Sequence, residues 1–344
     1  DGRLLIACEL TAGKASLLQS DGTPVSWTPN VKISPVFDWS PNSKRLAVRS
    51  EDGVRLYNVL ETNPPTIAAD AAVLLTVPAE SVSTVQWSPD GRHLAAVGDG
   101  RTVYIWKTDG STEPVATWET PVRSLAWTSP DTLMVGSTVD SKKGALQFWK
   151  LAGTRGEPIA LKLNPSALSI LAPHPDGSKF LISGNNEHLH LIDAAGTELF
   201  DLWGQNAHPW WSADGRRWGA MQSSSVSFGG ALRVYDAETN EPLYVSRTGG
   251  GAVGTTCTNI RGQVIACNTD YTVRAWNLED GSPVWTAVYL NTREIITLAP
   301  DGRIVYQGET NLNDALFYTV EHDDGRTETL SYDEFVKLAP GYKR

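Results

Sequence analysis

The chain has 344 residues, of which 20% are charged, and its formal net charge is −10 at pH 7. Nucleic-acid binding depends on clustered Lys and Arg that meet phosphates, so this acidic balance argues against a nucleic-acid partner. The longest apolar stretches have the length of strands, so no membrane-spanning helix is expected. Three cysteines are too few for a disulfide framework. Cys257 and Cys267 fall on predicted strands. We expect them to be small buried side chains, or a disulfide bridge if those strands are adjacent.

The sequence begins inside a repeating pattern. Its first residues, DGRLLIACEL, read as the second half of a turn–strand unit. We therefore expect a fragment or processed form of a longer polypeptide, with residues 1–344 forming a single domain. The few cysteines and the lack of a signal peptide predict a cytoplasmic location.

A unit built around a Ser-Pro-Asp-Gly-like turn recurs along the chain. The turn follows Trp39 as SPNS, Trp87 as SPDG and Trp211 as SADG. Pro, Asp and Gly suit successive positions of a tight turn, so each copy predicts a hairpin between a first strand a and a second strand b. Repetition at roughly 40 to 50 residues indicates units that bury their apolar faces only against one another.

Each unit is predicted to hold four short strands, a to d. Small apolar residues dominate the b strands, which suits the crowded interior of a ring. The c strands alternate apolar and polar residues around an aromatic residue, as half-buried strands do, and the more polar d strands suit an exposed edge. The a strands are predicted at 36–40, 84–88, 124–128, 168–172, 209–212, 254–258 and 295–299, and the c strands at 54–59, 103–108, 146–151, 189–194, 232–237, 273–278 and 316–321.

The c strands VYIWKT, LQFWKL and VRAWNL, each after an Asp-containing turn, and the WSPDG turn resemble the WD40 repeat. The resemblance covers about residues 24–321. It implies an all-β fold, a WD40-type β-propeller of seven complete units and a partial one, each a four-stranded antiparallel sheet. The pattern is similar to divergent WD40 arrays of bacterial proteins, including a planctomycete-like type. Most units lack the family's Gly-His pair before strand a, so packing is expected to replace its usual hydrogen-bond network.

Two ring sizes fit the sequence. Residues 1–28 supply additional b, c and d strands and residues 327–332 another d strand, so eight blades are slightly favoured over seven. The segment FVKLAP at 335–340 either closes the ring as the missing a strand or belongs to a short terminal helix over 332–338. Residues 322–344 are accordingly expected to be a closing strand or a tail.

Propellers of this family usually bind partners on the top face, formed by the d–a and b–c loops. In the aromatic segment 208–218, the repeat register places Trp211 in the core and Trp210 between blades, which leaves Trp203 and Trp218 as surface aromatics. The other candidates are charged or exposed residues in or near the loops, and ordinary rim charges are the simpler interpretation of the arginines. The candidate binding residues are Arg49, Arg123, Lys142, Lys143, His188, Trp203, Trp218, Phe228 and Arg293.

His188 and His190 point to the same side of a predicted strand, a spacing that can hold a metal ion. No third ligand is evident nearby except Glu187, so a solvated turn is the better interpretation. No metal, cofactor or catalytic residue is predicted.

We expect a non-catalytic scaffold or sensing module that binds another protein, or another domain of its parent chain, through top-face loops. The alternative is a carbohydrate-binding, lectin-like propeller, prompted by the 13 tryptophans. An enzyme with a site at the central channel is less favoured, because the predicted b strands are apolar there.

Overall fold

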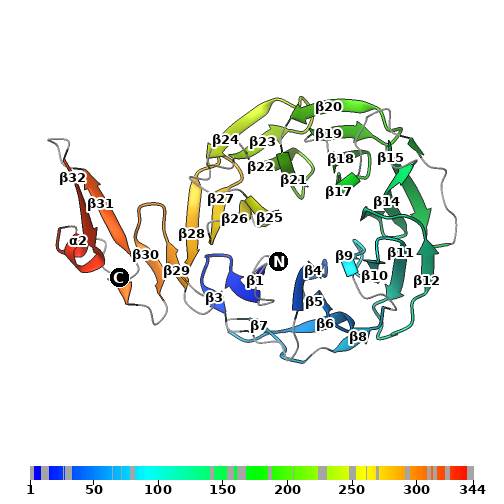
Figure 1. The fold of residues 1–344 in the computed structure, drawn as a ribbon, viewed down its shortest axis with the longest axis horizontal. Coiled ribbons are helices and arrows are strands. Elements are labelled where there is room, and N and C mark those ends of the chain that lie inside the picture. Colours follow the sequence, from blue (N-terminus) through cyan, green and yellow to red (C-terminus); the bar gives the residue numbers. More distant parts are fainter. Residues whose placement is uncertain are drawn as a thin grey trace.

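The computed structural model arranges antiparallel sheets around a ring, with the strand over residues 4–8 on its inner side and the C-terminal elements outside it (Figure 1). The structure describes residues 4–8, 15–25, 27, 33–63, 65–70, 72–77, 82–139, 143–152, 159–160, 168–184, 188–203, 205–223, 231–247, 253–260, 262–268, 271–290, 295–307, 311–312, 316–321 and 326–338.

Four sheets of the ring have four strands each, ordered along the chain from the inner to the outer strand. They are β9 (Val82–Trp87), β10 (His93–Gly98), β11 (Thr102–Lys107) and β12 (Ala116–Glu119); β13 (Ser124–Ser129), β14 (Thr132–Val139), β15 (Lys143–Lys150) and β16 (Ile159–Ala160); β17 (Leu168–Pro173), β18 (Lys179–Gly184), β19 (His188–Asp193) and β20 (Glu198–Trp203); and β21 (Gln205–Trp211), β22 (Arg217–Ser223), β23 (Ala231–Asp236) and β24 (Pro242–Arg247).

The remaining sheets have other strand numbers. Three strands form the first, β1 (Leu4–Cys8), β2 (Ala15–Gln19) and β3 (Pro24–Val25). Five form the next, β4 (Ile33–Trp39), β5 (Arg45–Ser50), β6 (Gly53–Leu60), β7 (Thr66–Ile67) and β8 (Val73–Leu75). Six form the last sheet of the ring, β25 (Val253–Ile260), β26 (Gln263–Asn268), β27 (Thr272–Asn277), β28 (Pro283–Tyr289), β29 (Ile295–Leu298) and β30 (Ile304–Gln307), and β31 (Phe317–Glu321) pairs with β32 (Thr327–Ser331) before α2 (Tyr332–Leu338).

The predicted all-β propeller is confirmed, and the predicted strands a to d occur in order in the sheets between β4 and β28. Six sheets have at least four strands, and the three-stranded sheet β1–β3 lies between the first and the last of them. The sequence left Cys257 and Cys267 as small buried side chains or as a bridge, and Cys267 forms no disulfide.

The last predicted unit differs from a four-stranded blade. Its a strand, β29, pairs with the outer strand β28 instead of lining the ring, and β31–β32 form a separate two-stranded sheet. The position of β29 is stabilised by burial, because Ile295 packs with Leu18 and Trp285. The segment 335–338 lies in α2, so the terminal helix is observed and the closing strand is not.

The recurring turns form as predicted, and their side chains hold them. Ser88 donates a hydrogen bond to Asp90, and Ser212 donates one to Asp214, while the backbone N–H two residues beyond each Asp donates to the same carboxylate. The hydrogen bond from Ser212 lowers the pKa of Asp214. Such Asp-centred turns are local, which is why the sequence predicts them well.

Indole hydrogen bonds connect neighbouring sheets. In three places a tryptophan on an inner strand donates from its Nε1 to a backbone carbonyl on the inner strand of the preceding sheet. The pairs are Trp87 to Asp38 at 3.1 Å, Trp127 to Gln86 at 3.2 Å and Trp211 to Ala172 at 2.9 Å. A buried indole N–H favours a nearby acceptor, and the repeat supplies one at these three boundaries.

The ring closes through strand β2, whose successive side chains face opposite neighbours. Leu17 packs with Leu46 and Tyr57 of the sheet that follows. Leu18 packs with Ile265 and Trp285 of the last sheet of the ring. Both leucines are almost fully buried, at 1% and 0% exposure. The three-stranded sheet therefore joins the beginning of the ring to its end by apolar packing.

Two hydrogen bonds reinforce this closure. The Trp285 indole donates to the carbonyl of Ser20 at 2.9 Å, and the Thr297 hydroxyl donates to the carbonyl of Gly22 at 2.7 Å. Gly22 has a φ of +85°, and a Cβ there would lie 2.7 Å from Thr297 Cγ2 and 2.9 Å from Trp285 Cε3. Only glycine fits this turn without displacing its neighbours.

Gly22→Ala tests the closure, with Gly262→Ala as its control. Gly262 has a φ of +72°, but nothing lies within 4 Å of its Cβ position. Both variants incur backbone strain of about 1–2 kcal/mol, and only Gly22→Ala adds overpacking of about 1–3 kcal/mol. Urea unfolding is expected to show the larger loss of stability in Gly22→Ala. Equal losses in the two variants would contradict the closure described.

Asp38 places a titratable carboxyl group at the boundary between β4 and β9. Its Oδ2 accepts the backbone N–H of Trp87 at 2.7 Å. Although part of the residue remains exposed, burial of the carboxyl raises its pKa to about 7, against the lowering effect of hydrogen bonds from the backbone of Trp87 and Trp39. Asp38 is therefore protonated in the folded chain over a pH range in which it is ionised in the unfolded chain.

This shift predicts a pH dependence of stability. Between about pH 4 and pH 7 the folded state binds the Asp38 proton more tightly than the unfolded state, so this contribution to the free energy of unfolding falls as the pH rises. Asp38→Asn retains an acceptor for Trp87 and lacks the titration. The stability difference between wild type and Asp38→Asn should fall by up to roughly 4 kcal/mol from pH 4 to pH 7. If urea unfolding gave the same pH dependence of the free energy of unfolding for wild type and Asp38→Asn, the raised pKa would be contradicted.

Candidate functional site

The connections between strands b and c, and between each sheet and the next, leave the ring at one end, which we call the upper rim. Backbone hydrogen bonds show the two kinds of connection together: Thr120 donates to Arg101, and Val122 donates to Gly100. The a–b and c–d turns lie at the opposite end, the lower rim. Loops on a rigid scaffold are the usual place for binding residues, so the upper rim is the first candidate surface.

The structure places four of the predicted binding residues at or near the upper rim. Arg49 lies near the end of β5 and is partly exposed, and Arg123 is exposed just before β13. His188 begins β19 and Trp203 ends β20. The arginines belong to different sheets from the other two, so the structure does not gather all four into one cluster.

The other predicted residues fall into two groups. Lys142, Phe228 and Arg293 lie outside the described residues, and Lys143 is described only as the first residue of β15. Trp218 was expected at the surface, and this prediction is wrong.

Trp218 is a core residue. It is 0% exposed, and its ring stacks on Tyr235 at 4.1 Å between centroids. Its indole N–H donates to the Asn240 side chain at 3.2 Å. The side chain faces the neighbouring sheet, where it packs with Leu181 and Leu189. Successive side chains of a strand point to opposite faces of its sheet, and both faces are buried where the sheet lies between two others. The prediction of a surface position for Trp218 overlooked this second buried face.

Trp203 is an exposed aromatic residue on the upper rim. All 13 tryptophans lie in the described part of the chain, and Trp203 is the one that is mainly exposed, at 65%. It stands directly across from His188 in the β19–β20 pair, so the two side chains share one face of the sheet. An exposed indole beside an imidazole offers both an apolar surface and hydrogen-bonding groups to a partner.

Tyr271 is a second exposed aromatic residue of the upper rim, and the sequence analysis missed it. It is 66% exposed and adopts a φ of +62° in the turn before β27. Left-handed backbone is unfavourable for a bulky residue, so a large exposed side chain there is a sign of function. Trp203 and Tyr271 belong to the two sheets that flank β21–β24.

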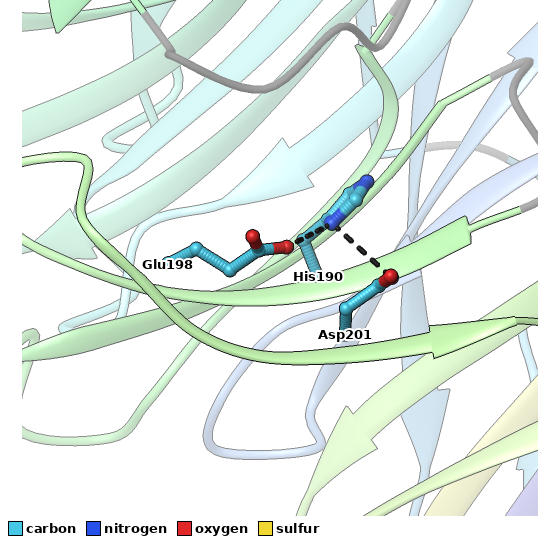
Figure 2. A group of neighbouring side chains, drawn as sticks. All are labelled: His190, Glu198 and Asp201. Carbon is cyan, nitrogen blue, oxygen red and sulfur yellow. Dashed lines mark hydrogen bonds and ion pairs between the residues drawn. The ribbon is translucent and has the colours of Figure 1, made fainter.

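A cluster of histidine and carboxylate side chains lies on the same sheet face as Trp203 (Figure 2). His190 Nδ1 is 2.7 Å from Glu198 Oε1 and 3.4 Å from Asp201 Oδ1. His188 Nδ1 is 2.8 Å from Asp201 Oδ1. The His190 side chain is 6% exposed, whereas those of Glu198 and Asp201 are 37% and 43% exposed. A buried imidazole nitrogen therefore meets two carboxylates that open to solvent.

His188 and His190 lie on one face of β19, as predicted from the sequence, whereas neither Glu198 nor Asp201 was predicted beside them. Asp201 lies directly opposite His190. Glu198 reaches this face because the register shifts between Leu191 and Ile192, where Leu199 is the additional residue of β20. Beyond a bulge of this kind, the residues that face the two sides of the sheet are exchanged. The alternation of apolar and polar residues in the sequence does not show where this happens.

A shallow hollow of about 410 Å³ lies on the lower rim between β10 and β11. Its lining includes Arg92, His93 and Lys107. Burial lowers the pKa of His93, whose ring stacks on Trp127 at 6.3 Å and whose Nδ1 has no hydrogen-bond partner. The hollow is small and open, so it ranks below the upper rim as a binding surface.

Comparison with known proteins agrees with the fold. Residues 73–107 match the family model "WD domain, G-beta repeat". Together with the ring of sheets, this match supports a WD40 β-propeller. No helix within the described residues is long and apolar enough to cross a membrane.

Two of the relatives are named Protein HIR1. That of Aspergillus oryzae is 30% identical over 132 residues, which is 30% of this chain and 12% of the relative. That of Kluyveromyces lactis is 35% identical over 86 residues, covering 22% of this chain and 10% of the relative. The "66 kDa stress protein" of Physarum polycephalum is 28% identical over 141 residues, covering 40% and 22%. The chain thus spans less than a quarter of the length of each of these relatives.

The propeller and the WD40 match support a protein-interaction scaffold in general terms. WD40 propellers are generally non-catalytic, which agrees with the expectation from the sequence.

Proposed function

We propose that this propeller is a non-catalytic scaffold that binds a protein partner across the upper rim, over the sheets from β17 to β28. The observation that carries the proposal is the exposure of two large aromatic side chains, Trp203 at 65% and Tyr271 at 66%. Tyr and Trp are the residues most enriched among those that dominate binding energy at protein interfaces.

The rim around these anchors is suited to a polar interface. His188 beside Trp203 is paired with Asp201, and Arg123 stands exposed at the start of the preceding sheet, β13–β16. Arg49 is less accessible and makes a weaker candidate for contact. The partner is another protein or another domain of the parent chain, as the sequence analysis proposed. The bacterial type of the repeat array and a cytoplasmic location stay predictions.

A carbohydrate ligand is the second candidate, and the exposed Trp203 indole favours it, because sugars stack on exposed aromatic rings. A glycan array probed with wild type and Trp203→Ala separates the two candidates. Binding of a defined glycan by wild type and its loss in the variant would favour the lectin-like function.

Site-specific crosslinking tests the scaffold proposal. A photo-reactive phenylalanine analogue at position 203 or 271 is expected to capture the same partner, which mass spectrometry identifies. The control position is 243, where Leu243 is 46% exposed on the outer strand β24 but near the lower rim. With the purified partner, Trp203→Ala and Tyr271→Ala should each weaken binding at least ~10-fold. Equal capture from position 243 and unchanged affinity of both variants would overturn the proposal.

Tyr271→Gly separates binding from stability. Glycine tolerates a positive φ, so the variant should be as stable as wild type or more stable, by about 1 kcal/mol. Affinity for the partner should nevertheless fall, because the aromatic ring is lost. Thermal unfolding and a binding isotherm on the same sample measure both effects, and unchanged affinity would remove Tyr271 from the interface.

A further inference from the structure

We propose that His190, Glu198 and Asp201 bind a divalent metal ion, for which Zn²⁺ is the best match. The three ligand atoms lie within 4.8 Å of one another. They come from the neighbouring strands β19 and β20 and converge on one point of the sheet face (Figure 2).

The chemistry of the ligand set favours zinc. Imidazole nitrogen and carboxylate oxygen bind Zn²⁺ at about 2.0–2.2 Å, which places the ligand atoms of a tetrahedral site roughly 3.4 Å apart. The distance from His190 Nδ1 to Asp201 Oδ1 already is 3.4 Å. The distance from His190 Nδ1 to Glu198 Oε1 is 2.7 Å, so the Glu198 carboxylate must withdraw by less than about 1 Å. Its exposed side chain has room for this movement.

One ligand is buried and the other two are exposed, which gives an ion site both a fixed ligand and access from solvent. His190 is held in place by its burial, at 5% exposure for the whole residue. Two carboxylates directed at one imidazole nitrogen bring two formal negative charges to a single point, and a divalent cation balances them. The exposed sides of Glu198 and Asp201 provide the path by which an ion enters.

His188 completes the arrangement as a positioning residue. Its Nδ1 lies 2.8 Å and 3.0 Å from the two oxygens of Asp201, and its ring stacks on that of His190 at 5.7 Å. It orients the Asp201 carboxylate toward His190. Partners of this kind change metal affinity when they are removed, typically 10- to 100-fold.

The location gives the ion a structural role within one sheet, on the face that packs against the preceding sheet. Ile192, on the same face of β19 as His190, packs with Met134 and Leu146 of the sheet that holds β13–β16. The cluster lies farther along this face toward the upper rim. Zinc there would fasten β19 to β20 beside Trp203, and it would do so without any partner protein.

Zinc titration of the isolated, chelator-treated protein tests the proposal. Calorimetry is expected to show one high-affinity Zn²⁺ per chain, and thermal unfolding a higher midpoint with Zn²⁺ present. Glu198→Gln and Asp201→Asn keep the size of the side chains and should each weaken binding at least ~10-fold, and His188→Gln should weaken it about 10-fold. Co²⁺ in place of Zn²⁺ should give the visible absorption of a tetrahedral site.

Asp176→Asn is the matched control, because the Asp176 carboxylate also contacts a histidine, His174, at 2.6 Å. Among the residues that the structure describes, no second carboxylate joins that pair. Its zinc affinity should equal that of wild type. The proposal is overturned if wild type binds no Zn²⁺ below millimolar concentration, or if Glu198→Gln and Asp201→Asn bind it as tightly as wild type; the cluster then consists of ion pairs only. Both outcomes are independent of partner binding at Trp203.

Discussion

The packing of Leu17 and Leu18 on opposite sides of β2 is the constraint on which the ring depends. Each sheet of the propeller buries its faces against its two neighbours, so an open ring would expose two apolar faces to water. The three-stranded sheet β1–β3 covers both faces, and hydrogen bonds from Trp285 and Thr297 attach its last turn to the end of the ring. Residues about 265 positions apart in the sequence are thereby held together.

A closed ring explains why the candidate sites are on its edge. Residues inside the boundaries between sheets, such as Trp218, are committed to packing and indole hydrogen bonds. Side chains at the ends of strands contribute less to that packing, and Trp203 and Tyr271 lie exposed there on a rigid support. Because the support is rigid, an exposed aromatic residue loses little freedom when a partner binds, which favours its use as an anchor.

The sequence predicted what depends on local chemistry. The turns around Asp90 and Asp214, the order of the strands, the place of Trp210 between two sheets and the packing of Trp211 against the core follow from residues close together in the chain. It did not predict what depends on register or on distant contacts. The bulge at Leu199 brings Glu198 to His190, and β29 pairs with β28 because Ile295 finds its apolar partners there.

Hydrogen exchange measured by mass spectrometry tests the closure most directly. If β1–β3 closes the ring, the backbone amides of β2 and β28 should exchange at similar rates, because opening their boundary exposes both, and Gly22→Ala should accelerate both together. Rapid exchange of β2 while β28 stays protected, in wild type and in the variant, would show that the ring is stable without its first sheet and would contradict the account.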